Sequence, residues 1–146
     1  MSTFVVGVDG SAESVAALRH AIREARLHGA GVKAVAVWHV PTAAYGGAFA
    51  PATPDPHEFE RLAAGTLESA LAAVADELEG VPLASVVREG DPAQTLLEEA
   101  EGAEQLVVGC AHHGLLGRLV HHSVSGECSR EARCPVTVVH GREGTA

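Results

Sequence analysis

The fold is decided by the stretch Phe4-Val5-Val6-Gly7-Val8-Asp9-Gly10-Ser11. Its apolar residues follow one another without polar alternation, which is typical of a strand that is buried on both faces, and we predict this strand over residues 4–9. A helix is expected to begin after Ser11, because Val15, Leu18 and Ile22 recur at helical spacing and serine is a favoured N-cap. A buried strand that leads directly into a helix predicts a β-α unit of a parallel sheet.

The same alternation of strand and helix patterns continues along the chain. Valine-rich runs predict further strands over residues 32–40, 83–88, 105–109 and Val136–His140. An apolar helical stripe runs over residues 59–78 and includes Leu62, while Asp91 and Pro92 form an N-cap followed by a first-turn proline. A last helix is expected over residues 123–132. Five strands and four helices predict a single domain over residues 1–146, folded as a three-layer α/β/α sandwich around a five-stranded parallel sheet.

Composition and charge narrow the function classes. The chain has 146 residues, of which 47% are hydrophobic, which is enough for one globular core. Its 19 acidic and 10 basic residues give a net charge of −9, and no basic cluster is present, so we expect neither nucleic-acid nor membrane binding. No apolar run approaches the roughly 18 residues of a membrane span, and no signal-peptide pattern opens the chain. Together with three cysteines, read as reduced thiols, these features predict a cytoplasmic protein.

Five short motifs along the chain share the pattern of one family. They are residues 6–11 (Val-Gly-Val-Asp-Gly-Ser), 38–41 (Trp-His-Val-Pro), 89–92 (Glu-Gly-Asp-Pro), 106–109 (Leu-Val-Val-Gly) and 134–139 (Cys-Pro-Val-Thr-Val-Val). With these motifs the chain resembles the universal stress protein family over nearly its whole length. The resemblance implies an adenine nucleotide alpha hydrolase-like fold with strand order 3-2-1-4-5. It also implies a stress-response function, ATP with magnesium as a cofactor, and a homodimer formed through the last strand, Val136–His140.

The resemblance also implies which residues line the nucleotide site. In ATP-binding members a glycine-rich pattern that ends in Ser or Thr wraps around the phosphates, and Gly109 and Ser123 match it in register. Two positions that are glycine in the family pattern are His112 and His122 here. Carried over residue by residue, the site would hold Asp9 near the ribose or phosphates, Gly10 and Ser11 in the same turn, Val40 near adenine, and Gly109, His112, His122, Ser123, Val124 and Ser125 along the phosphate path.

The histidine substitutions leave two functions open. A side chain at His112 or His122 occupies space that a glycine leaves free for phosphate, so the protein is either a nucleotide-binding stress module with a degenerate loop or a family member that acts through protein partners. A third reading is a His-rich module that responds to metals or anions, since His113 and His121 lie in the same stretch. The spacing matches no established zinc pattern, and we expect a solvated or phosphate-contacting role with no metal. No residue indicates catalysis beyond slow ATP hydrolysis, because nothing identifies an acid and base for Cys110.

Overall fold

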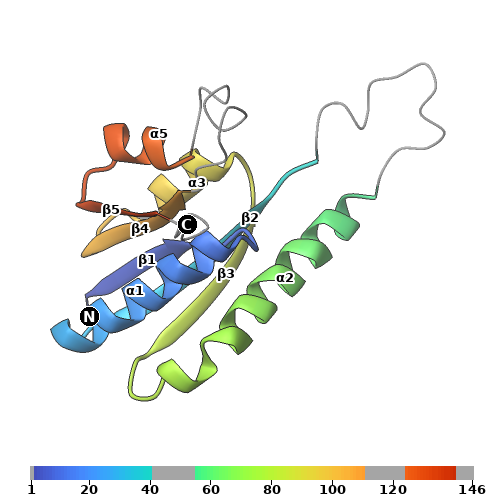
Figure 1. The fold of residues 1–146 in the computed structure, drawn as a ribbon. Coiled ribbons are helices and arrows are strands. Elements are labelled where there is room, and N and C mark those ends of the chain that lie inside the picture. The colour runs from blue at the N-terminus through green and yellow to red at the C-terminus, as the bar shows by residue number, and fades with distance from the viewer. Residues whose placement is uncertain (1, 41–54, 111–123, 141–146) are drawn as a thin grey trace, which may run out of the picture.

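The computed structural model describes residues 2–40, 55–110 and 124–140 (Figure 1). Five strands, four α-helices and one short 3-10 helix are found there. In chain order they are β1 (Thr3–Gly7), α1 (Ala12–His28), β2 (Gly31–Trp38), α2 (Pro56–Ala73), η2 (Ala75–Glu77), β3 (Leu83–Glu89), α3 (Pro92–Glu99), β4 (Gln105–Cys110), α5 (Val124–Glu131) and β5 (Val136–His140).

The strands form one parallel sheet in the order β3-β2-β1-β4-β5, which confirms the predicted fold. In the centre of the sheet, Val5 of β1 pairs with Lys33 of β2 and with Leu106 of β4. Helices α1 and α2 cover one face, whereas α3 and α5 lie on the other (Figure 1). Because β1 lies between β2 and β4, the winding of the chain reverses at β1, and ligands of such sheets bind at this kind of position.

The core is divided by the sheet into two apolar layers. Phe4 and Val6 point toward α1 and pack with Leu18 and Ile22, all of them at most 1% exposed. Val5, between them in sequence, points to the other face and belongs to the layer that is shared with α3 and α5. Successive strand residues face opposite sides, so a run without polar alternation is needed to fill both layers.

Two predicted helix starts are confirmed by their caps. Ser11 Oγ accepts a hydrogen bond from Ser14 N at 3.1 Å at the start of α1. A carboxylate oxygen of Asp91 accepts one from Gln94 N at 3.0 Å at the start of α3, with Pro92 as the first helical residue. These side chains satisfy N–H groups that the first turn of a helix leaves without a partner.

The second helix differs from its prediction in length and in one buried residue. It ends at Ala73 and continues as the 3-10 turn η2, and Arg19 donates to the freed Ala73 carbonyl at 3.3 Å. Leu62, expected on the apolar stripe, is 68% exposed, so that assignment is wrong. The physical reason is position: the packing of α2 against the core begins at Ala63, and only Leu67 and Ala70 are fully buried within the helix.

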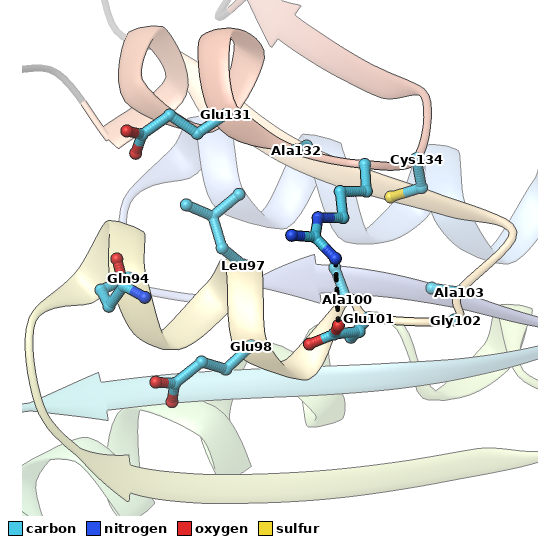
Figure 2. A pocket seen from close by; sticks show the side chains of 11 residues that line it. Gln94, Leu97, Glu98, Ala100, Glu101, Gly102, Ala103, Glu131, Ala132 and Cys134 are labelled. Atoms are coloured by element: carbon cyan, nitrogen blue, oxygen red, sulfur yellow. Dashed lines mark ion pairs between the residues drawn. The ribbon is translucent and has the colours of Figure 1, made fainter.

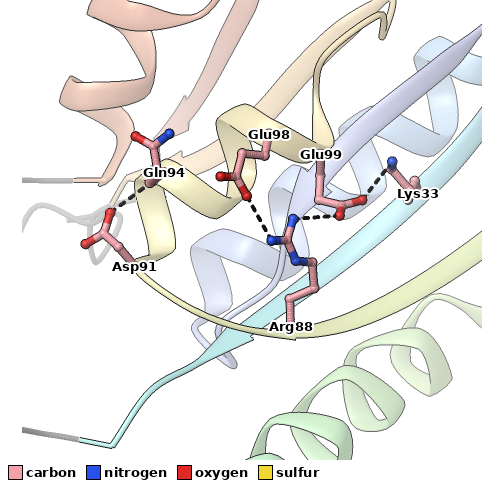
Figure 3. Close-up of polar contacts among 6 residues, drawn as sticks. All are labelled: Lys33, Arg88, Asp91, Gln94, Glu98 and Glu99. Carbon is pink, nitrogen blue, oxygen red and sulfur yellow. Dashed lines mark hydrogen bonds and ion pairs between the residues drawn. The ribbon is translucent and has the colours of Figure 1, made fainter.

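A chain of charged side chains attaches α3 to the sheet (Figure 3). Glu99 receives hydrogen bonds from Lys33 of β2 at 2.8 Å and from Arg88 of β3 at 3.0 Å, and Arg88 also reaches Glu98 at 2.8 Å. The bond from Lys33 is the largest cause that lowers the pKa of Glu99 below its usual value.

No helix within the described residues is both long and apolar enough to cross a membrane.

Candidate functional site

The turn between β1 and α1 is held by a compact set of hydrogen bonds. Asp9 Oδ1 accepts from Ser11 N at 3.0 Å and from Ser11 Oγ at 2.6 Å. Ser14 Oγ donates to the Ser11 carbonyl at 3.0 Å and accepts from Asp9 N at 3.3 Å. Gly10, between the two linked residues, has φ of +89°, a backbone conformation that glycine adopts at little cost. The motif at residues 9–11 therefore builds a turn with its carboxylate fixed at the start of α1.

Asp9 combines a fixed position with an available oxygen. Its side chain lies at the N-terminus of α1, where the helix dipole stabilises negative charge. Both hydrogen bonds to the carboxylate use Oδ1, and within the described residues no hydrogen bond is formed by Oδ2. Asp9 is exposed, so Oδ2 can accept a hydrogen bond from a ligand.

Gly109 lets β4 approach the first turn of α1. A Cβ at this position would lie 2.6 Å from the carbonyl carbon and oxygen of Glu13 and 2.9 Å from Ser14 N. These are backbone atoms, which cannot move aside as the end of a flexible side chain can. The glycine predicted from the nucleotide motif is therefore required by the packing of α1 on the sheet, whether or not a nucleotide binds.

A cavity of about 160 Å³ lies at the carboxyl ends of the central strands, next to Asp9. The ends of β1, β2 and β4 form its base, and the first turns of α1, α3 and α5 surround it. Its lining residues are Gly7, Val8, Asp9, Ser14, Val35, Val37, Pro92, Leu96, Val108, Gly109 and Val124. Apolar walls with one carboxylate at a helix N-terminus are suited to a ligand that is partly apolar and carries hydroxyl groups.

The structure describes seven of the ten predicted site residues and places them in different surroundings. Asp9, Gly109 and Val124 line the cavity. Gly10 faces a separate groove beside α2, and Ser11 serves as the cap of α1. Ser125 is buried in α5, where its carbonyl accepts from Ser129 Oγ at 2.8 Å, and Val40 is half-buried just beyond the end of β2. The remaining three, His112, His122 and Ser123, lie outside the described residues.

Sequence reasoning missed the walls that α3 and β2 contribute. Leu96 is 4% exposed and lines the cavity together with Pro92 and Val37. A signal for Pro92 was present, because the turn at residues 89–92 follows a strand and therefore lies at the same edge of the sheet as Asp9. No comparable signal marks Leu96, whose part in the cavity becomes visible only when α3 is placed over β1.

In the described part of the chain, no group of three or more His, Cys, Asp or Glu side chains is arranged to hold a metal ion. The clustered histidines singled out in the sequence, His112, His113, His121 and His122, all fall in residues 111–123, outside that part.

Comparison with known proteins shows one family. The family described as the universal stress protein family matches residues 1–140. A universal stress protein of Mycolicibacterium smegmatis is 36% identical over 149 residues, which cover 97% of this chain and 49% of that protein. The chain thus spans about half the length of the curated relatives it matches.

Two solved structures share the fold. One is a universal stress protein in complex with cAMP, which is 22% identical, has a TM-score of 0.71, and is matched over 95% of this chain and 97% of that one. The other is the universal stress protein from Archaeoglobus fulgidus in complex with dAMP, with 24% identity, a TM-score of 0.67, and coverage of 95% and 98%. At these identities the likeness concerns the fold.

Proposed function

The chain belongs to the universal stress protein family, and we propose that it is a stress-response module that binds an adenine nucleotide in the strand-end cavity. The observation that carries this proposal is the cavity itself, which joins the Asp9 carboxylate to apolar walls at the point where the sheet reverses its winding. The likeness in fold to proteins solved with cAMP and with dAMP supports the same class of ligand.

The chemistry of the cavity suggests how such a ligand would be oriented. Val37, Leu96 and Val124 offer apolar contacts to a purine base. Asp9 Oδ2 is suited to accept a hydrogen bond from a ribose hydroxyl, whereas its charge would repel a phosphate placed beside it. The phosphates then extend away from Asp9. ATP with magnesium is the finer form of the proposal, and His112, His122 and Ser123 are the residues we expect along its phosphate path.

Calorimetric titration with AMP, dAMP, cAMP and adenine tests the proposal, with ATP measured with and without magnesium. We expect the nucleotides to bind, and Asp9→Asn to weaken AMP binding about tenfold because a hydrogen bond to a charged acceptor is lost. Adenine, which lacks the ribose, should bind the wild type and the variant alike. Asp76→Asn, which removes an exposed carboxylate on η2, is the matched control and should leave AMP binding unchanged.

Two outcomes of this titration would contradict the proposal. Absence of binding by every nucleotide at millimolar concentration would exclude the cavity as a nucleotide site. Equal losses in Asp9→Asn and Asp76→Asn would mean that only net charge matters, and the assignment of Asp9 would fail.

We further propose that the protein is a homodimer joined through β5. This strand lies at the edge of the sheet, and Val136, Val138 and Val139 are all only half-buried, so an apolar edge is available for pairing. Light scattering that finds a monomer at micromolar concentration would overturn this proposal.

A cytoplasmic location is proposed as well, because Cys110, Cys128 and Cys134 are free thiols, as expected in a reducing compartment.

A further inference from the structure

We propose that the groove between α3 and α5 is a docking site for a basic segment of a partner protein in which arginine alternates with aliphatic residues. This α3–α5 groove has a volume of about 440 Å³ and lies between the C-terminal half of α3 and the end of α5, away from the strand-end cavity (Figure 2). The proposal goes beyond nucleotide binding and does not depend on it.

The groove combines an apolar base with an acidic rim. Ala100 is buried, and Leu97, Ala103 and Cys134 are half-buried, so aliphatic and sulfur atoms form the base. Three exposed carboxylates, those of Glu98, Glu101 and Glu131, stand around it; the guanidinium of Arg133 also lines the groove, and that of Arg88 bonds Glu98. An apolar base within a charged rim is the arrangement found in protein interfaces.

Two of the three rim carboxylates have no partner closer than 3.9 Å among the described residues. Within the described residues, Glu131 forms no hydrogen bond or ion pair. Glu101 is paired with Arg133 at a long 3.9 Å, and both side chains are highly exposed, at 70% and 90%. Only Glu98 has a short partner, Arg88, at 2.8 Å. An incoming cation therefore meets two exposed carboxylates, those of Glu101 and Glu131, that have no close cationic partner among the described residues.

Arg133 marks a position from which a guanidinium can pair with a rim carboxylate. It follows the end of α5, and its ion pair with Glu101 is the dashed line in Figure 2. Exposed pairs of this kind contribute little to stability, so the arginine of a partner can replace Arg133 at small cost. An arginine has the further advantage that its aliphatic stem can lie on Leu97 while its charged end reaches the rim.

The occupant is a basic partner segment and not a second copy of this chain. A second copy seated here in a symmetric contact would bring the same acidic rim against this one, whereas the homodimer proposed above pairs through β5. A small polyamine would satisfy the carboxylates but would leave the base around Leu97 and Ala103 in water. A peptide with aliphatic side chains between its arginines covers both parts of the groove.

The test uses a short blocked peptide in which leucine alternates with arginine, labelled with fluorescein and followed by anisotropy. A peptide with citrulline in place of each arginine keeps the shape and removes the charge. Glu101→Gln combined with Glu131→Gln removes two rim carboxylates, both of them exposed, so folding should be preserved. Glu68→Gln combined with Glu79→Gln removes the same charge from the α2 side of the sheet and is the matched control.

We expect the arginine peptide to bind, the citrulline peptide to bind more weakly, and the rim variant to weaken binding about fivefold, with less than about a twofold change in the control pair. In NMR spectra of the isotope-labelled protein, peptide binding should change the backbone amide chemical shifts of Gly102 and Ala132, which line the groove. Absence of binding, equal losses in the two variant pairs, or shift changes confined to other surfaces would overturn the proposal. So would a rim variant that alters the sedimentation of the protein alone, because the occupant would then be a second copy.

Discussion

Replacing Gly109 with alanine should strongly destabilise the protein, because the new methyl group has no space between β4 and α1. It would lie 2.6 Å from two backbone atoms of Glu13, whereas ordinary contacts of a Cβ begin at 3.4 Å. The strand and the helix would have to separate by about 0.8 Å to restore contact distance. Both elements are anchored by residues that are almost completely buried, so the separation would loosen the packing of the core.

The expected loss of stability depends on which atoms the new methyl group of Gly109→Ala contacts. Overpacking a core costs about 1 to 3 kcal/mol, and we place Gly109→Ala near 3 kcal/mol because the neighbours belong to the backbone. For a domain of this length, that loss lowers Tm by about 10 °C. Gly7→Ala should cost less, about 1 kcal/mol, since its Cβ would meet the flexible end of Leu96 at 2.8 Å.

Gly65 provides the matched control, because it lies within α2 and a Cβ there meets no atom within 4 Å. Gly65→Ala should therefore stabilise the protein by about 0.5 to 1 kcal/mol, as alanine is the better helix former. Urea unfolding followed by circular dichroism measures all three variants, provided that the slope of the transition is unchanged. The reasoning is refuted if Gly109→Ala loses less than about 1 kcal/mol or no more than Gly7→Ala.

Three further perturbations test other parts of the structure. Glu99→Gln removes the charge and replaces one of the two oxygens that accept from Lys33 and Arg88 by an amide NH2, which should cost about 2 kcal/mol at neutral pH. Because the pKa of Glu99 is lowered in the folded state, its contribution to the free energy of unfolding is present above the ordinary pKa of 4.5 and is lost as pH falls below that value. The free energy of unfolding should therefore decrease less steeply with falling pH in the variant, and equal slopes would contradict this. Burial raises the pKa of the Cys128 thiol from 9.0 to about 11, so stability should fall as pH rises through this interval, and Cys128→Ala should make that fall smaller; an equal fall in the variant would contradict this. Mass spectrometry after iodoacetamide treatment should find Cys128 modified quickly only in urea, and fast labelling of the folded protein would disprove its burial. Ser11→Ala removes the cap of α1 and should cost about 1 kcal/mol in urea unfolding; an unchanged midpoint would show that the cap contributes nothing.

Local sequence patterns were sufficient to predict the elements of the fold, because the signals involved act over a few residues. The apolar run at 4–8 had to be a doubly buried strand, and Asp91 followed by Pro92 had to begin a helix. The exposure of Leu62 was not predictable in the same way. A helical stripe shows which side of α2 is apolar, but not how far along its length the sheet lies beneath it.

The candidate site was predicted in part, and the division has a physical cause. Asp9 and Gly109 could be found from their motifs, since a turn and a close approach each demand a particular residue type. No particular residue type is required at Leu96 and Val37, because any apolar side chain of suitable size can form a cavity wall. Their part in the site depends on which strands and helices are neighbours.

The sequence by itself determined the type and order of the elements, the caps Ser11 and Asp91 of α1 and α3, and the net acidic charge of the chain. Only the tertiary structure decided which side chains meet. The carboxyl ends of β1, β2 and β4 come together because β1 lies between the other two strands, and this creates the cavity beside Asp9. In the same way, α3 and α5 follow different strands and meet only because both crossovers return over one face of the sheet. The pairing of Glu101 with Arg133, and the groove around it, follow from that meeting.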